Sequence, residues 1–217
     1  MAFDTILFDL DGTLTDPGIG ITNSIAYALE QRGMPVPPRE RLYRFIGPPL
    51  LDEFQKVYGV SEAEARELVA QFRVYFQSRG IYENRMYDGI PEMLQRLLNH
   101  GCRLVLATSK PEVFAEQVLE HFSLRKYFTA VAGSTIEEGR TDKAEVIAYA
   151  LDKLEETGRP LMVGDRKHDV MGAQTNGIPC LGVLYGYGSR EELTEAGADR
   201  LAAEVPDVAD LILSPEF

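Results

Sequence analysis

The sequence predicts an α/β fold, a doubly wound, Rossmann-like parallel sheet with an inserted helical domain. Three observations lead to this prediction. Short apolar runs recur along the chain and are continuous rather than alternating, which is typical of strands covered on both faces. Amphipathic segments with helical spacing separate these runs. A long stretch after the first run has helical spacing only.

Four apolar runs are the expected strands. The first, Thr5–Leu10, is closed by Asp11-Gly12, a pair that favours a tight turn. Because a parallel sheet is covered by helices on both faces, runs without polar alternation fit its strands well. The other strands are expected at residues 103–108, 161–165 and 180–184, with a weaker candidate at 127–132.

Three helices are expected between the later strands. The segment 91–100 ends at Gly101, and glycine favours helix ends. The segment 111–122 carries apolar side chains on one side, and the segment 142–157 repeats them at helical spacing. Strand and helix therefore alternate, as they do in doubly wound α/β folds.

Residues 16–85 form the expected insertion. An apolar residue recurs every four positions near its start, and a second apolar stripe follows a Ser61–Glu64 capping box. We therefore expect two domains, an α/β core of residues 1–15 and 86–217 and a helical domain of residues 16–85. We interpret the insertion as a cap over the carboxyl edge of the sheet.

The composition is that of a globular protein and argues against two classes of partner. Of the 217 residues, 45% are hydrophobic and 26% charged, and no apolar stretch approaches the roughly 20 residues of a membrane-spanning helix. The net charge of −12 argues against nucleic acid, because phosphate backbones are held by clustered Lys and Arg. We expect neither a membrane nor a nucleic-acid partner.

The start of the chain and its cysteines favour the cytoplasm. Met1–Asp4 lacks the basic and apolar regions of an export signal. Cys102 and Cys180, the only cysteines, each lie in an apolar run, so buried free thiols are expected rather than a disulfide. We expect a cytoplasmic protein that is a monomer or a homodimer.

Two carboxylates mark the end of the first expected strand. Asp9 and Asp11 lie two positions apart, and the carboxyl edge of a parallel sheet is where ligands generally bind. One interpretation is chemistry at this edge. The alternative is structural, with Asp11-Gly12 making a turn and Asp9 capping a neighbouring group.

The apolar run at residues 161–165 ends in another carboxylate, Asp165, and Asp169 follows four residues later. Four acids would then converge on one edge of the sheet. Like charges about 4 Å apart repel by about 4 kcal/mol at an effective dielectric of 20, so such a cluster calls for a cation. An all-oxygen ligand set favours Mg²⁺. The alternative for Asp165 and Asp169 is capping of the following helix.

Residues near two further helix starts are candidates for binding an anion. Thr108 and Ser109 close the 103–108 run and offer hydroxyl and backbone donors where a helix N-terminus favours negative charge. Lys143 lies at the start of a helix, where the helix dipole disfavours a cation, so a nearby anionic target would explain it. The alternatives are that Ser109 is an N-cap and Lys143 a solvated lysine.

These residues, taken in order, resemble the four motifs of the haloacid dehalogenase superfamily. The resemblance spans the chain. The helical insertion after the first motif is similar to a subgroup that includes phosphoglycolate phosphatases, 5′-nucleotidase-like phosphatases and β-phosphoglucomutases. The matching motifs are Asp9-Leu-Asp11-Gly-Thr-Leu-Thr, the strand-terminal Thr108, Lys143, and Gly164-Asp165-x-x-x-Asp169.

The resemblance implies a Mg²⁺-dependent phosphatase that acts on small phosphate monoesters, of the phosphoglycolate or nucleoside monophosphate class. Asp9 would attack phosphorus and form an aspartyl-phosphate, and Asp11 would act as general acid and then general base. The dehalogenase branch of the superfamily lacks the second aspartate. The presence of Asp11 therefore points to phosphoryl transfer.

The resemblance also implies the ligands of the site. Mg²⁺ would be held by Asp9, by the backbone carbonyl of Asp11 and by Asp165, with Asp169 supporting the ion. Substrate phosphoryl oxygens would be bound by Thr108, Ser109 and Lys143.

Arg44, in the insertion, is a further candidate for contact with an anionic substrate. It precedes the rigid turn Gly47-Pro48-Pro49, and similar segments face the site in related phosphatases; the alternative is a solvated arginine. Two other functions stay open. One is a phosphosugar mutase on the same scaffold, and the less favoured one is a non-catalytic phosphometabolite-binding protein.

Overall fold

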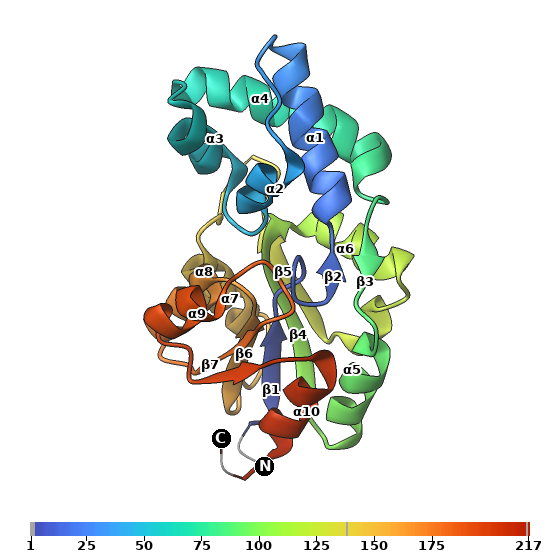
Figure 1. Cartoon of the computed structure of the whole chain (residues 1–217). Coiled ribbons are helices and arrows are strands. Elements are labelled where there is room, and N and C mark those ends of the chain that lie inside the picture. Colours follow the sequence, from blue (N-terminus) through green and yellow to red (C-terminus); the bar gives the residue numbers. More distant parts are fainter. Residues whose placement is uncertain (1–2, 138, 216) are drawn as a thin grey trace. The chain divides into compact units, whose positions relative to one another are not determined.

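The chain divides into two compact units in the computed structural model, which describes residues 3–137, 139–215 and 217 (Figure 1). One unit holds the residues up to Asp16 together with those from Met86 onward. The other unit is Pro17–Arg85. No helix in the described part of the chain is long and apolar enough to cross a lipid bilayer.

The larger unit is built on a six-stranded sheet in which every pairing is parallel. The strand order is β5-β4-β1-β6-β7-β8, so the chain builds outward on one side of β1 and then on the other. This confirms the doubly wound α/β fold. The strands are β1 (Thr5–Phe8), β4 (Arg103–Pro111), β5 (Ala130–Ser134), β6 (Pro160–Gly164), β7 (Cys180–Val183) and β8 (Arg200–Ala202).

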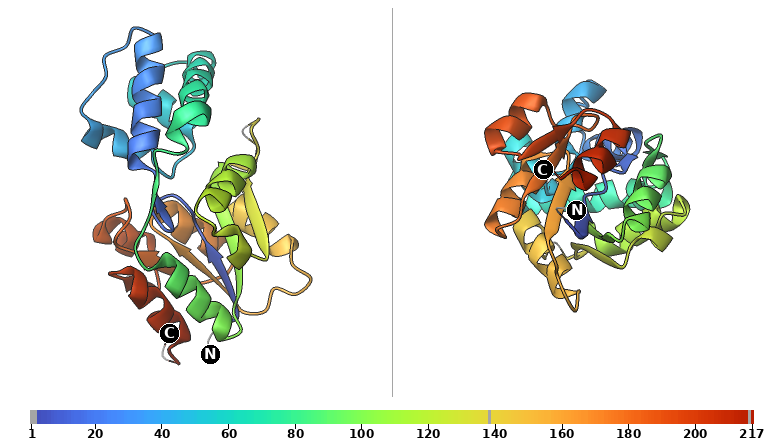
Figure 2. Two further views of the ribbon diagram at one scale, coloured as in Figure 1. Left: turned by 90° about the vertical axis from the view of Figure 1, so that its right-hand side faces the viewer. Right: turned by 90° about the horizontal axis from the view of Figure 1, so that it is seen from below.

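Helices cover both faces of this sheet (Figure 2). Alternate strand residues point to opposite faces, and on one face Leu7, Val105 and Met162 form a buried cluster with Ile147 and Val170 of the covering helices. Burying one such side chain is worth about 1.5–3 kcal/mol. The helices are α5 (Ile90–Asn99), α6 (Glu112–His121), α7 (Lys143–Asp152), α8 (Lys167–Thr175), α9 (Arg190–Ala196) and α10 (Val205–Leu213), with a 3₁₀ turn η3 (Arg125–Tyr127).

Two of the predicted elements have other boundaries in the structure, and three elements of this unit were not predicted. Residues 125–127 form η3, so β5 begins at Ala130 rather than near 127. α7 ends at Asp152 instead of reaching 157. The N–H of Leu154 donates to the carbonyl of Leu151, three residues earlier, which closes a 3₁₀-type turn in place of the next α-helical turn. β8, α9 and α10 were not predicted.

The smaller unit is helical, and its first and fourth helices pack together. Ser61 caps α4 as predicted: its hydroxyl accepts from Glu64 N–H at 3.4 Å, and Glu64 Oε2 accepts from Ser61 N–H at 2.9 Å. The elements are α1 (Gly18–Gln31), α2 (Arg39–Leu42), a 3₁₀ turn η1 (Tyr43–Phe45), α3 (Leu50–Tyr58), α4 (Glu62–Tyr75) and a π-helical turn η2 (Phe76–Gly80).

Two short strands carry the chain between the units. β2 (Thr15–Asp16) and β3 (Arg85–Met86) form a two-stranded sheet. The sequence prediction placed no strand near these positions, because two-residue strands are too short to show any periodicity. We call β2 and β3 the hinge strands.

Candidate active site

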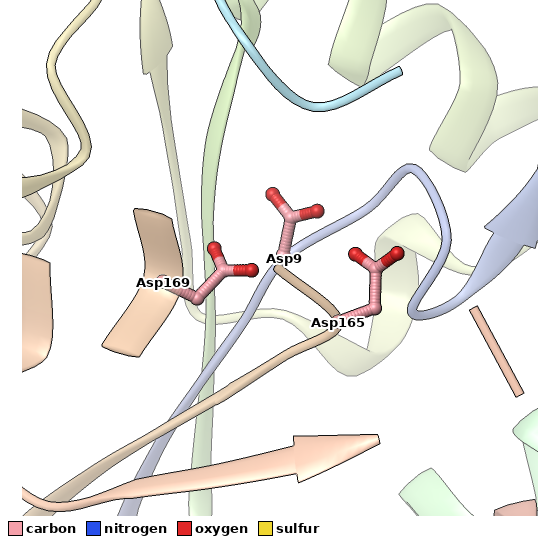
Figure 3. Close-up of side chains that lie close together, drawn as sticks. All are labelled: Asp9, Asp165 and Asp169. Carbon is pink, nitrogen blue, oxygen red and sulfur yellow. The ribbon is translucent and has the colours of Figure 1, made fainter. Parts of the chain in front are cut away.

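Three carboxylates meet at the carboxyl ends of β1 and β6. One oxygen from each of Asp9, Asp165 and Asp169 lies within 4.8 Å of the others, and all three residues are buried. Asp9 directly follows β1, and its N–H donates to Val163 O of β6 at 2.9 Å. In Figure 3 the three side chains extend toward the same side. The sheet reverses its winding between β1 and β6, the place where α/β folds bind ligands.

Glycines allow this close approach. Gly12 has a φ of +91°, which suits glycine alone at the turn after β1, and a Cβ there would collide with the Asp165 carboxylate. A Cβ on Gly164 would collide with the Asp169 carboxylate in the same way. The D-x-D-G and G-D-x-x-x-D patterns therefore have a steric meaning in addition to a chemical one.

Lys143 lies among the acids. It is the first residue of α7, and its Nζ is 2.5 Å from Asp9 Oδ1 and 2.7 Å from Asp169 Oδ1. Burial would lower the pKa of Lys143, but the charges of Asp169 and Asp9 outweigh it and raise that pKa. Asp142 provides the N-cap, accepting from Ala144 N–H at 2.7 Å. The helix start thus has an acid of its own, and Lys143 is not a solvated lysine.

Asp165 and Asp169 also hold backbone groups. Asp169 Oδ2 accepts from Arg166 N–H at 3.0 Å, so the capping interpretation is correct for one of its oxygens. Asp165 instead accepts at Oδ2 from the N–H of Tyr187, 2.7 Å away on another loop. Each acid therefore has one oxygen fixed by the backbone, and the second oxygen of Asp169 pairs with Lys143.

The acids carry more negative charge than one lysine balances. Burial raises the pKa of Asp9, against the opposing effect of Lys143. Burial and the charges of Asp169 and Asp9 hold the pKa of Asp165 well above its usual range. Asp165 Oδ1 is buried without a hydrogen-bond partner in the described residues. An oxygen-rich, partly unpaired set of this kind fits a divalent cation.

Asp11 lies apart from these three acids and pairs with a residue that sequence analysis missed. Lys110 Nζ is 2.6 Å from Asp11 Oδ2, and the Lys110 side chain is only 6% exposed. Burial raises the pKa of Asp11, and the Lys110 charge opposes that rise. Asp11 Oδ1 has no partner in the part of the chain that the structure describes. Lys110 lies only two residues after Thr108 in the sequence, and this proximity to a candidate site residue could have revealed it.

Thr108 and Ser109 lie within β4 rather than at its end. Thr108 is buried and its hydroxyl accepts from Lys110 N–H at 3.2 Å. The strand continues to Pro111 and α6 begins at Glu112, so Ser109 is not the helix N-cap. The Ser109 carbonyl instead accepts from Ser134 Oγ at 2.8 Å.

Arg44 lies in the helical unit, in η1. Its Nε is 3.4 Å from Glu53 Oε1. The Arg44 side chain is 48% exposed, whereas that of Glu53 is 8% exposed. Arg44 therefore neutralises a buried carboxylate with one edge of its guanidinium and keeps the rest accessible.

Comparison with known proteins identifies the class. Residues 6–183 match the family model described as haloacid dehalogenase-like hydrolase. A predicted phosphatase from Clostridium acetobutylicum has a crystal structure that superposes with a TM-score of 0.94 at 42% identity, covering 98% of this chain and 99% of that one. The chain belongs to the haloacid dehalogenase-like hydrolase family.

The names of individual relatives indicate narrower activities than the family description does. A 5′-nucleotidase of Pseudomonas aeruginosa is 48% identical over 89% of this chain and 88% of its own length. Tyrosine-protein kinase PtkA of Mycobacterium tuberculosis is 40% identical over 84% of this chain and 62% of its own length. A phosphoglycolate phosphatase of Agrobacterium fabrum is 28% identical, over 83% of this chain and 80% of its own length. The predicted enzyme class is confirmed: this chain is a phosphatase of the family.

Proposed function

We propose that the enzyme is a Mg²⁺-dependent phosphatase that hydrolyses small phosphate monoesters through an aspartyl-phosphate on Asp9. The observation that carries the proposal is the contact of Asp9 with Lys143, beside Asp165 and Asp169. A carboxylate that only capped a backbone group would need neither a buried lysine nor two acidic neighbours. A nucleophile that meets a phosphate needs both.

Asp9 is the nucleophile of the first step. One of its carboxylate oxygens attacks phosphorus, the bond from phosphorus to the ester oxygen breaks, and an acyl phosphate forms. In the second step the oxygen of a water attacks the same phosphorus and the bond to Asp9 breaks. Inorganic phosphate leaves and the Asp9 carboxylate is restored, so one hard displacement becomes two easier ones.

Asp11 moves the protons. In the first step its protonated carboxyl gives a proton to the departing alkoxide, and in the second its carboxylate takes one from the attacking water. Both forms must be accessible near neutral pH. The opposing effects of burial, which raises its pKa, and Lys110, which lowers it, support this dual role.

The residues present fit Mg²⁺. Its ligands would be a carboxylate oxygen of Asp9, the backbone carbonyl of Asp11 and the side chain of Asp165, with Asp169 supporting the ion. When bound, the ion would offset the charge that develops on the phosphoryl oxygens. The unpaired Asp165 Oδ1 supports this assignment, as does the excess of acids over lysines.

Thr108, Ser109 and Lys143 would bind the phosphoryl group. Lys143 is already desolvated and held at Asp9, so it is preorganised beside the position of attack. Thr108 and Ser109 lie within the neighbouring strand β4, close to its carboxyl end at Pro111, and would supply hydroxyl and backbone donors. Phosphoryl transfer depends mainly on such positioning and charge stabilisation.

The substrate class is taken from the relatives and from charge. A nucleoside monophosphate or phosphoglycolate fits the names of two relatives, and the net charge of −12 favours a small metabolite over nucleic acid. In this proposal the helical unit Pro17–Arg85 is the cap, and the exposed edge of Arg44 contacts the substrate anion. A cytoplasmic enzyme, monomeric or homodimeric, completes the proposal.

Asp9→Asn tests the nucleophile. We expect phosphate release from a panel of nucleoside monophosphates, phosphoglycolate and sugar phosphates to fall by at least about 10³-fold, with circular dichroism and thermal unfolding showing an intact fold. The matched control is Asp152→Asn at the exposed end of α7, which should keep full activity. Undiminished turnover of Asp9→Asn would exclude the assignment. A requirement for a sugar bisphosphate as activator would favour the mutase instead.

A further inference from the structure

The loop of residues 185–188 follows β7, and we call it the tyrosine loop. It contacts both the acid cluster of Asp9, Asp165 and Asp169 and the hinge strand β2. The backbone N–H of Tyr187 donates to Asp165 Oδ2 at 2.7 Å, and the hydroxyl of the same residue donates to Asp16 Oδ1. Asp16 ends hinge strand β2 and is the last residue before the helical unit. A single residue thus joins a proposed metal ligand to the point where the chain leaves the core.

Tyr185 contacts the chain next to each of the two hinge strands. Its hydroxyl donates to the carbonyl of Thr13 at 3.2 Å, in the segment that leads into β2. Its ring lies edge-on against Tyr87, with ring centroids 5.1 Å apart, and Tyr87 directly follows hinge strand β3. Tyr87 N–H in turn donates to Leu14 O at 3.2 Å. The loop therefore contacts the outgoing and the returning chain.

The backbone of the tyrosine loop packs tightly against Asp165. A Cβ on Gly186 would collide with the side chain of Asp165 and with the carbonyl of Gly12. A Cβ on Gly188 would collide with the carbonyl of Asp165. Only a glycine backbone fits this closely, so a shift of the Asp165 carboxylate is passed to the loop rather than absorbed by it.

We propose that Tyr187 is a positioning residue that couples divalent-cation binding at Asp165 to the order of the hinge strands. The inference rests on the proposed metal site. A cation held by Asp165 fixes that carboxylate and, through the Tyr187 N–H, the loop; the Tyr187 hydroxyl then holds Asp16 in place. Coupling of this kind is reciprocal, so ordering the hinge also strengthens cation binding.

Hydrogen exchange with Mg²⁺ alone, without substrate, tests the coupling. In the wild type we expect Mg²⁺ to slow amide exchange in peptides covering residues 13–17 and 84–88 by about fivefold or more, the lower end of typical coupling. Tyr187→Phe keeps the N–H to Asp165, so it should still bind Mg²⁺ by calorimetry, with an affinity lowered only by about the same factor as the lost protection. Its Mg²⁺-dependent protection of the hinge should disappear. Asp16→Ala removes the acceptor instead and should have the same effect.

Tyr75→Phe is the matched control. The Tyr75 hydroxyl also donates to a carboxylate, Glu83 Oε1 at 3.0 Å, but both residues belong to the helical unit. This bond is separate from the one between Tyr187 and Asp16. This variant should keep the Mg²⁺-dependent protection of the wild type. Calorimetric binding of Mg²⁺ without hinge protection in the wild type, or full protection in Tyr187→Phe, would overturn the coupling alone. Absence of Mg²⁺ binding in the wild type would overturn the metal site as well.

Discussion

At the scale of single residues, the site is a set of buried charges that partly compensate one another. Lys143 forms ion pairs with both Asp9 and Asp169, and Lys110 forms an ion pair with Asp11. Each lysine stabilises the ionised form of its carboxylate, whereas burial favours the neutral form. The two lysines therefore oppose, without cancelling, the rise in pKa that burial causes at the proposed nucleophile Asp9 and at the proposed proton carrier Asp11.

Lys110→Met should change the pH dependence of catalysis. Lys110 lowers the pKa of Asp11, so removing its charge lets burial raise that pKa further. In the proposed mechanism the second step needs Asp11 as carboxylate, and a higher pKa means that this form appears only at higher pH. The acidic limb of the kcat profile should move upward, with kcat at neutral pH lowered about tenfold or more.

The measurement is kcat against pH at saturating substrate and Mg²⁺. Lys56→Met, an exposed lysine of α3, is the control and should leave the profile unchanged. A Lys110→Met enzyme with reduced kcat but an unmoved acidic limb would mean that Lys110 acts on something other than the ionisation of Asp11.

The acids of the site were predictable from sequence, and their partners less so. Asp9, Asp11 and Asp165 closely follow strand ends, and Asp169 lies in the first turn of the next helix; the parallel sheet brings these positions together. Lys110 escaped notice because β4 was expected to stop at Thr108, which left Lys110 in an assumed loop. The bond from Tyr187 could not be foreseen, since it joins Asp165 to a residue whose loop has no periodicity.

At the scale of elements, the helix starts position the chemistry. α7 presents Lys143 as its first residue, and this depends on the cap by Asp142. α8 is tied down by Asp169 at its N-terminus. Each of these two helix starts therefore holds a site residue through a bond that also stabilises the helix.

Asp142→Ala should lower both stability and activity. Loss of an N-cap costs about 1 kcal/mol, and the freed first turn of α7 lets Lys143 move away from Asp9. We expect kcat to fall about tenfold, while Asp142→Ser, which can still cap, stays near the wild type. Ser61→Ala removes the comparable cap of α4 and should cost similar stability without the loss of kcat. Equal effects of Ser61→Ala and Asp142→Ala on kcat would contradict this account.

Most long, strongly patterned elements were predicted and the shortest ones were not; the exception is α10, which was missed although Val205, Val208 and Ile212 form a buried stripe along its nine residues. The strands from β1 to β7 that carry continuous apolar runs were found, because burial on both faces leaves an unmistakable pattern. β8 and the hinge strands have three residues or fewer, so no pattern can form. α9 has seven residues, of which only Leu193 is buried, and therefore too little apolar surface to stand out.

At the scale of the whole molecule, the acid cluster links stability to pH and to Mg²⁺. In the folded protein the pKa values of Asp9 and Asp165 are raised, whereas in the unfolded chain they take the ordinary value of about 3.9. Between the ordinary and the raised values, the folded state binds more protons than the unfolded one. These two groups therefore stabilise the fold at low pH, and that contribution is lost as the pH rises through the raised values.

Mg²⁺ should reverse this loss, because it binds the deprotonated carboxylates. At a concentration of 100 times its Kd it adds about 2.7 kcal/mol, which for a chain of this size raises Tm by roughly 5–10 °C. We expect that increase at about pH 8 and a much smaller one at about pH 5.5. Asp165→Asn removes one repelling charge and one ligand, so at pH 8 its Tm without metal should rise and its response to Mg²⁺ should vanish. Thermal unfolding of both proteins with EDTA and with Mg²⁺ at the two pH values measures this, and an equal Mg²⁺ response at both would contradict a site built on these acids.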